Sequence, residues 1–391
     1  MAHRVESMLS LSEIETQALE RLSPKAISYY ASAAGDEITK SENNKHYQSI
    51  LLRPRIFVDC STCNINTTIL GHRIGLPVYI SPAAQARLAH SDGESAIAAA
   101  CSKFKSLQII SHNASQRPED IVRSAPSVVF AWQLYVLKDI EKTENIIRRI
   151  NKIPQIRFIV LTLDAPFPGK READERFKTK EAQAGNESQA WGTEAGLTWT
   201  KTLPWLASQT HLPIVLKGIQ SHEDALLATH FPAVKAIILS NHGGRALDTA
   251  VTPVQLLLEI HRFCPQVFEK VEMLVDGGIK RGTDVVKALA LGAKAVGIGR
   301  AALYGLAVGG QAGVERTLQS TNLHSYRKIL VVDCNYSSSR RNLHGYEITW
   351  SGKRVAAWKS TCKYTNKTFI ICSPSKLISR STLGPYLVIS F

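Results

Sequence analysis

The chain has 391 residues, 44% of them hydrophobic and 20% charged, which is the composition of a globular protein with enough apolar material for a large core. Its apolar stretches are interrupted by Pro, Lys, Arg or Asp before they reach the ~18 to 20 residues of a membrane span, so we expect no membrane span. The net charge is +14, and most of it comes from residues 321–391, which contain eleven Lys or Arg and two acidic residues. The rest of the chain has a net charge of only +5, which argues against a nucleic-acid partner.

The N-terminal sequence MAHRVESMLSLSEIETQALERLSP, residues 1–24, alternates acidic and apolar residues. It lacks the uninterrupted apolar core of a signal peptide. It therefore predicts an amphipathic helix in an intracellular protein, for which we expect a cytoplasmic location, with a peroxisomal or mitochondrial one as the alternative.

The seven cysteines have no regular spacing and do not make a disulfide framework. Cys60 and Cys63 form a C-x-x-C, but no second pair or suitably spaced histidines accompany them. We interpret them as ordinary thiols and expect no metal site.

Eight β-rich runs recur between Leu76 and Arg300, and each is followed by a turn and then by a segment with helical spacing. The runs are hydrophobic nearly throughout, which is typical of strands buried on both faces. Eight such units predict an α/β protein with a (β/α)8 barrel, and a doubly wound sheet is the alternative. The runs are residues 77–81, 107–111, 128–135, 157–164, 213–217, 236–240, 272–276 and 295–299, and the helical segments include 92–104, 138–150, 221–231 and 282–293.

The active site of a barrel lies at the carboxyl ends of its strands. Nearly every run ends in a polar or titratable group. Loops begin there, so chance supplies some polar residues, but it does not select these chemical types repeatedly. The sequence therefore predicts a site on this face, built from Pro82, Ala83, Ala84, Ser111, Gln133, Tyr135, Thr162, Asp164, Lys217, Ser240, His242, Asp276, Gly277, Gly278, Gly299 and Arg300.

The loops after the last two runs have the residues of a phosphate site. In DGGIKRGTD, residues 276–284, adjacent glycines let backbone amides approach an anion and Lys280 adds charge. In GIGRAA, residues 297–302, Arg300 precedes a predicted helix whose N-terminal amides can face a phosphate. The second loop also matches a dinucleotide fingerprint, but that would require an open sheet and leave seven strands unexplained.

The stretch SNHGGRALD, residues 240–248, places His242 after the sixth run. Asp164 should project over the same barrel mouth, where a carboxylate orients an imidazole and stabilises its protonated form. Arg171 and Arg245 offer guanidinium groups to a carboxylate, and Lys217 in an apolar setting needs an anion or a ligand. A lone loop histidine is usually only solvated, but this convergence favours a catalytic base.

These residues resemble the FMN-dependent L-2-hydroxy acid oxidases and dehydrogenases, which include glycolate oxidase and the flavin domain of flavocytochrome b2. The motifs SNHGGRALD, DGGIKRGTDVVKALALGAKAV, GKREAD, WQLYV, RLAHSDGE and YYASAAGDE carry the resemblance, over about residues 22–319. It implies an enzyme that converts a 2-hydroxy acid to a 2-oxo acid with FMN. Oxygen or a diffusible electron acceptor is expected because no cytochrome-like domain precedes the barrel, and the resemblance implies a homo-oligomer.

The resemblance also implies a role for each site residue. His242 corresponds to the base, Asp164 to its partner and Tyr135 to the group that binds the reacting hydroxyl. Tyr29, Arg171 and Arg245 correspond to the residues that bind the substrate carboxylate. The FMN contacts would come from Pro82, Ala83, Ala84, Ser111, Gln133, Thr162, Lys217 and Ser240, and its phosphate would be held by Asp276, Gly277, Gly278, Lys280, Gly299 and Arg300.

The sequence departs from the family pattern at several positions. The family's Pro-Thr-Ala is here Pro82-Ala83-Ala84, which loses a hydroxyl. Lys280 replaces an arginine, so a bidentate grip on phosphate becomes a point charge. Asn113 stands where an aromatic or apolar residue is usual near the substrate.

The last part of the chain, residues 321–391, does not continue the family's final barrel helix. We expect an FMN-binding domain over 1–320 and an atypical basic tail over 321–391. The tail is either a diverged, disordered appendage or the product of mis-splicing or a shifted reading frame, and we favour the second. The alternative function is a catalytically impaired barrel whose tail binds nucleic acid or acidic membrane.

Overall fold

The computed structural model describes residues 5–53, 57, 64–183 and 192–321, together with the backbone of 348–350, 353–354 and 387–390. Cys60, Cys63 and most of the 321–391 segment lie outside these residues. The interpretations of the C-x-x-C and of the tail therefore stay predictions.

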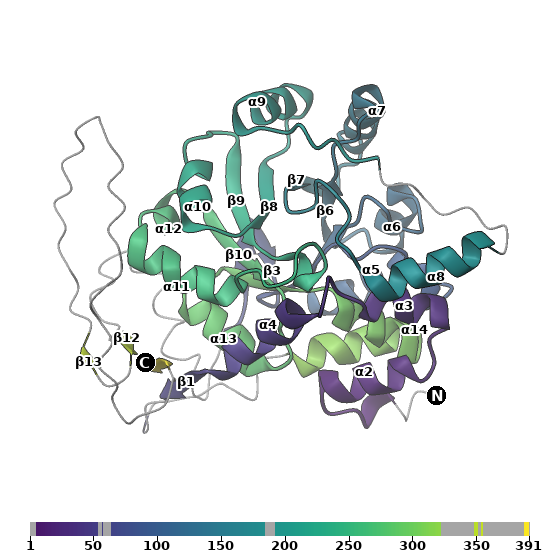
Figure 1. Cartoon of the computed structure of the whole chain (residues 1–391), viewed down its shortest axis with the longest axis horizontal. Coiled ribbons are helices and arrows are strands. Elements are labelled where there is room, and N and C mark those ends of the chain that lie inside the picture. Colours follow the sequence, from purple (N-terminus) through teal and green to yellow (C-terminus); the bar gives the residue numbers. More distant parts are fainter. Residues whose placement is uncertain are drawn as a thin grey trace.

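Eight parallel strands form a closed barrel in the order β10-β11-β4-β5-β6-β7-β8-β9 (Figure 1). The barrel closes where Val296 of β11 pairs with Val78 of β4. Each predicted run overlaps one strand, so the (β/α)8 prediction is confirmed and the doubly wound alternative is wrong. The strands are β4 Val78–Ile80, β5 Leu107–Ile110, β6 Val129–Leu134, β7 Ile156–Thr162, β8 Ile214–Ile219, β9 Val234–Leu239, β10 Glu272–Asp276 and β11 Ala295–Ile298.

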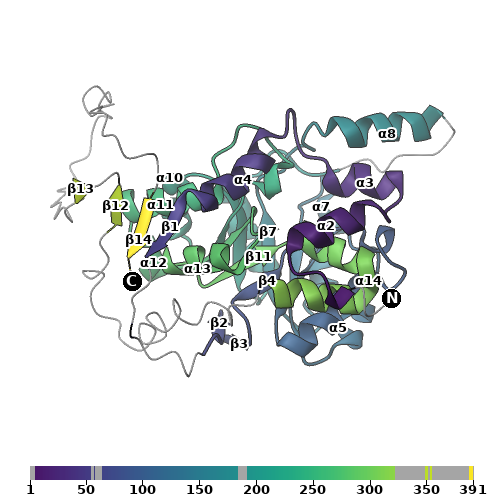
Figure 2. The same ribbon diagram turned by 90° about the horizontal axis from the view of Figure 1, so that it is seen from below.

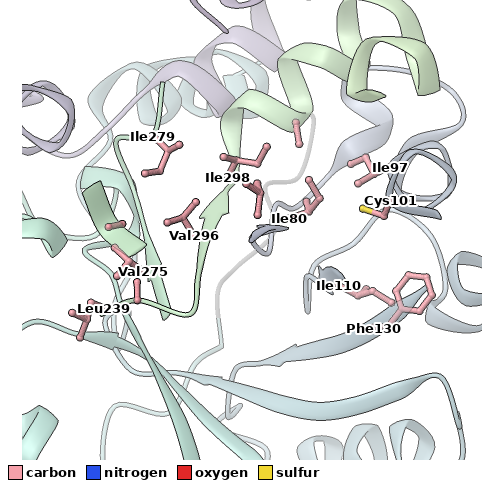
Figure 3. Packing of buried hydrophobic residues seen from close by; sticks show 14 of the residues in the cluster. Ile80, Ile97, Cys101, Ile110, Phe130, Leu239, Val275, Ile279, Val296 and Ile298 are labelled. Atoms are coloured by element: carbon pink, nitrogen blue, oxygen red, sulfur yellow. The ribbon is translucent and has the colours of Figure 1, made fainter. Parts of the chain in front are cut away.

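The strands are hydrophobic throughout because their side chains enter two separate buried layers. On β4, Tyr79 belongs to the cluster inside the barrel, whereas Val78 and Ile80 belong to the cluster between the barrel and the helices. Figure 3 shows part of the outer layer, where Ile80 and Ile298 lie near Ile97 of α5 (Gly93–Phe104). The hairpin of β2 (Thr67–Ile69) and β3 (His72–Ile74) adds Ile69 and Ile74 to the inner cluster and closes the barrel at the amino ends of its strands.

The helices between the strands begin at polar capping residues. Asp139 accepts a hydrogen bond from the Lys142 amide at the start of α7 (Ile140–Ile150), and Ser221 accepts one from the Asp224 amide at the start of α10 (His222–Ala228). The four helical segments predicted from spacing contain α5, α7, α10 and α13 (Gly282–Ala290). The other helices that follow barrel strands are α6 Pro118–Ser124, α8 Glu172–Gln183, α9 Trp199–Gln209, α11 Pro253–Phe263, α12 Val267–Lys270 and α14 Arg300–Ser320.

The predicted N-terminal amphipathic helix is α2 (Leu11–Leu19), and it is followed by α3 (Pro24–Ala31) and α4 (Ile38–Gln48). Leu11, Ile14 and Ala18 form the buried face of α2, which packs against α14 (Figures 1 and 2). In the described part of the chain, no helix has both the length and the apolar character needed to cross a membrane.

The described strands of the last segment join a small separate sheet. Strand β1 (Ile50–Arg53) pairs in parallel with β14 (Leu387–Ser390), which pairs with β12 (Ile348–Trp350), and β12 pairs with β13 (Lys353–Arg354). Figure 2 shows β1, β12 and β14 side by side. The division of the chain at residue 320, where α14 ends, stays a prediction.

Candidate active site

A cavity of about 800 Å³ opens at the carboxyl ends of the barrel strands. All of the predicted site residues line it except Asp164 and Ser240, which lie directly behind His242. The fold therefore brings the predicted site residues together around one cavity.

His242 follows β9 and begins a tight turn in which three consecutive residues adopt left-handed backbone conformations. The φ angles are +59° at His242, +64° at Gly243 and +77° at Gly244. A Cβ atom on Gly244 would lie 2.7 Å from the amide nitrogen of Lys40, so this position requires glycine. The turn holds the imidazole at the barrel mouth.

The imidazole of His242 lies between a carboxylate and a phenol. Its Nδ1 is 2.8 Å from Oδ1 of Asp164, and its Nε2 is 3.5 Å from the hydroxyl of Tyr135. Burial acts to raise the pKa of Asp164, but the charges of Lys217 and then His242 hold that pKa below its ordinary value. Asp164 is therefore a carboxylate that fixes the orientation of the ring.

Lys217 is a buried cation beneath the site, only 3% exposed. Its Nζ donates to Ser240 Oγ at 3.0 Å and lies 3.9 Å from a carboxylate oxygen of Asp164 and 3.8 Å from one of Asp276. Ser240 Oγ also accepts the His242 amide at 3.1 Å. Lys217 therefore has two carboxylates near it, which are the anionic groups that an ammonium in an apolar setting requires.

Two arginines converge on the ring of Tyr29. The guanidinium carbons of Arg171 and Arg245 lie 5.4 and 5.3 Å from its centre. Burial, and then the neighbouring charge of Arg171, lower the pKa of Arg245 to about 10. Arg171 pairs with Asp174 at 2.9 Å, while its buried Nη1 has no hydrogen-bond partner. Two close cations with an unused donor form a site for an anion such as a carboxylate.

A row of amide and hydroxyl groups crosses the barrel mouth beside Lys217. The Gln133 carboxamide accepts from Ser111 Oγ at 3.3 Å and from the His112 amide at 2.9 Å, and donates to Thr162 Oγ1 at 3.1 Å. These bonds fix the orientation of the Gln133 amide. The row suits the polar edge of a flat heterocycle.

The far end of the cavity is built for an anion. Gly277 and Gly278 have φ angles of +95° and +80°, and a Cβ atom on Gly278 would lie 2.4 Å from the carbonyl oxygen of Asn43. Arg300 donates from Nη2 to the Gly243 carbonyl at 2.6 Å, while its buried Nη1 has no partner. Lys280 instead bonds to Glu15 of α2, with Nζ 3.0 Å from Oε2.

A model of the FMN-dependent dehydrogenase family matches residues 18–325. The chain belongs to this family. L-lactate dehydrogenase (cytochrome) of Saccharomyces cerevisiae is 36% identical over 81% of this chain, but the chain spans only 56% of that protein. L-lactate oxidase of Nostoc sp. is 41% identical over 80% of this chain and 91% of its own length. The solved flavin-binding domain of baker's yeast flavocytochrome b2 superposes with a TM-score of 0.78 at 35% identity, covering 83% of each chain.

Family membership confirms the resemblance noted in the sequence and makes FMN the cofactor of this protein. The cavity fits that molecule. The unpartnered Arg300 Nη1 and the glycine backbone suit the phosphate, the Gln133 and Thr162 row suits the ring edge, and Lys217 places a cation beside it. Ala83 and Ala84 line the cavity without the hydroxyl of the usual threonine.

Sequence reasoning missed several residues that hold the site in place. Asp174 pairs with Arg171 three positions away on α8, and that spacing could have indicated it. Ser81 donates to Asp276 at 3.1 Å and directly precedes the predicted Pro82. Glu15 lies 265 residues from Lys280, and no local pattern connects them.

Proposed function

We propose that this protein oxidises an L-2-hydroxy acid to the corresponding 2-oxo acid with bound FMN. The observation that carries the proposal is the imidazole of His242, bonded to Asp164 on one side and open to a cavity with two arginines on the other. Bound FMN would accept the two electrons and the second proton that leave the substrate, while His242 takes the first proton.

The substrate carboxylate binds between Arg171 and Arg245, with the hydroxyl of Tyr29 as a further donor. Burial raises the pKa of Tyr29, and burial also raises that of Tyr135, so both phenols stay protonated. Tyr135, at 3.5 Å from His242, directs the reacting hydroxyl toward the base. This arrangement fixes the orientation of the substrate before the reaction.

His242 Nε2 takes a proton from the hydroxyl or the α-carbon of the substrate. Asp164, held as a carboxylate, stabilises the imidazolium through the 2.8 Å contact with Nδ1. Lys217 stabilises negative charge that develops beside it.

The remaining predicted residues hold FMN in this proposal. Its ring contacts the wall of the barrel mouth and its phosphate the glycine loops. The wall residues are Pro82, Ala83, Ala84, Ser111, Gln133, Thr162, Lys217 and Ser240, and the phosphate residues are Asp276, Gly277, Gly278, Lys280, Gly299 and Arg300.

The electrons pass to oxygen or to a diffusible acceptor. The relative from Nostoc sp., of which this chain covers 91%, is named an L-lactate oxidase, which supports oxygen as the electron acceptor. The cytoplasmic location, the homo-oligomer and the division at residue 320 stay predictions.

The test is a visible absorption spectrum of the purified protein before and after anaerobic addition of glycolate, L-lactate and a longer L-2-hydroxy acid. We expect a flavin band that one of them bleaches. If the protein is folded and carries a flavin band that none of these acids bleaches, the proposed reaction is contradicted.

The alternative of an impaired barrel with a binding tail is not favoured, because the contacts of His242 with Asp164 and the two arginines beside Tyr29 support the proposed reaction. It predicts nucleic-acid or acidic-vesicle binding that falls steeply with salt and is lost when residues 321–391 are removed.

A further inference from the structure

Besides Lys217, three lysines line the cavity, and each is paired with a glutamate. Lys40 bonds to Glu37 at 2.7 Å and Lys45 to Glu42 at 2.9 Å, both three positions away in the chain. Lys280 bonds to Glu15 at 3.0 Å, and this pair alone of the three joins distant elements. Arg300, by contrast, keeps a buried Nη1 without a partner.

Glu15 is presented to the cavity by a helix that is firmly docked. The α2 residues Leu11 and Ile14 are buried in the core, and Arg316 of α14 donates to the Met8 carbonyl at 2.6 Å. The Glu15 side chain is 29% exposed and that of Lys280 is 44% exposed. The backbone of Glu15 is therefore fixed, while its carboxylate and the ammonium of Lys280 are free to change rotamer.

We propose that Glu15 competes with the flavin phosphate for Lys280 and thereby sets how strongly the protein discriminates FMN from its phosphate-free form, riboflavin. The inference rests on the proposed phosphate site. Glu15 is a specificity-determining residue in this view, because it weakens binding of the phosphate and leaves binding of the ring unchanged.

The competition follows from charge and geometry. A phosphate carries close to two negative charges at neutral pH and would approach Lys280 beside a carboxylate already in contact with it. The Glu15 carboxylate, 3.0 Å from the Lys280 ammonium, neutralises part of its charge and repels a second anion that approaches the same group. Binding of the phosphate to Lys280 is therefore weakened while the Lys280–Glu15 contact persists, whereas Arg300 has an unpaired donor.

The test compares FMN and riboflavin binding to the full-length protein stripped of flavin, followed by quenching of flavin fluorescence. Glu15→Gln removes the carboxylate and keeps its shape. We expect the Kd for FMN to fall about twofold to tenfold, the range set by a partly exposed ion pair and a nearby like charge, and the Kd for riboflavin to stay unchanged. Glu20→Gln makes the same charge change at the exposed end of α2 and should alter neither.

Two further variants separate this inference from the site on which it rests. Lys280→Gln should weaken FMN binding but not riboflavin binding. Glu15→Gln should increase FMN affinity less in the Lys280→Gln protein than in the wild-type protein. If Lys280→Gln and Arg300→Gln both leave the ratio of FMN affinity to riboflavin affinity unchanged, the proposed phosphate site is wrong. If those two variants lower this affinity ratio but Glu15→Gln weakens FMN binding, then Glu15 positions Lys280 and the competition is refuted.

A change of equal size for both ligands in Glu15→Gln would also refute the competition, because it would mark a structural effect on the cavity. Glu15→Ala serves as a second variant. Its thermal midpoint, compared with that of Glu20→Gln, verifies that α2 remains docked.

Discussion

Replacing Lys217 by methionine removes the cation that lies between two buried carboxylates. Lys217 is 3% exposed and its ammonium lies 3.9 Å from Asp164 and 3.8 Å from Asp276. At such distances each attraction amounts to about 4 kcal/mol at an effective dielectric constant near 20, and the desolvation of the ammonium offsets part of it. Breaking a buried ion pair by removing one partner costs about 3–5 kcal/mol, and we expect that loss in the free energy of unfolding.

The loss should depend on pH in a definite direction. Burial acts to raise the folded-state pKa of Asp164, but the charge of Lys217, the largest of the lowering causes, contributes to a pKa below the ordinary value. Asp164 therefore contributes stability above its unfolded pKa of about 4, and the contribution is lost as the pH falls through the folded value. Without Lys217 that folded pKa rises, so acid destabilisation should begin at a higher pH.

Urea unfolding of the flavin-free protein between pH 4 and 8 measures both effects. Lys270→Met, at an exposed lysine of α12, is the matched control and should change stability by less than about 0.5 kcal/mol. A loss below 1 kcal/mol in Lys217→Met, with the acid limb unmoved, would refute the electrostatic role assigned to this lysine.

Three further substitutions test the rest of the site. His242→Gln should lower kcat/KM by roughly 10²- to 10⁴-fold in steady-state assays while the flavin band persists, and an unchanged rate would exclude His242 as the base. Arg171→Lys keeps the charge but loses the fork, so KM for the hydroxy acid should rise about tenfold or more, and an unaltered KM would place the substrate carboxylate elsewhere. Gly278→Ala forces a Cβ atom to within 2.4 Å of the Asn43 carbonyl at a φ of +80°, so a loss of about 1–3 kcal/mol in urea unfolding and weaker FMN binding are expected. Wild-type stability in that variant would contradict the packing described for the loop.

The barrel could be predicted from the sequence because strands buried on both faces leave a strong local signal. The run of residues 236–240 was visible as continuous hydrophobicity, although β9 begins earlier, at Val234. The predicted run ending at Lys217 stops short of β8, which continues to Ile219. Gly218 is a residue type common in turns, yet it lies within β8 with a φ angle of +103°. A Cβ atom at this position would lie 2.6 Å from the side chain of Asp164, so the absence of a side chain makes room for that carboxylate.

The site was predictable where the residue type and the strand end together identify the chemistry. His242 and Asp164 come from strands that local patterns locate, and closure of the barrel brings them to 2.8 Å. The partner of Lys280 was not predictable in this way. The apolar face of α2 shows that the helix is buried, but only the packing against α14 determines that Glu15 reaches the phosphate end.

The two ends of α14 connect that packing to the cavity. Arg300 begins the helix at the phosphate site, and Arg316, near its end, donates to Met8 just before α2. The backbone angles at Gly309 and Gly310, with φ +57° at Gly310, form a kink in α14, and α14 packs against α2. In the proposed phosphate site, α14 would therefore supply Arg300 directly and act on Lys280 through the position of Glu15. A change in residues 311–320 should affect flavin affinity although none of them lines the cavity.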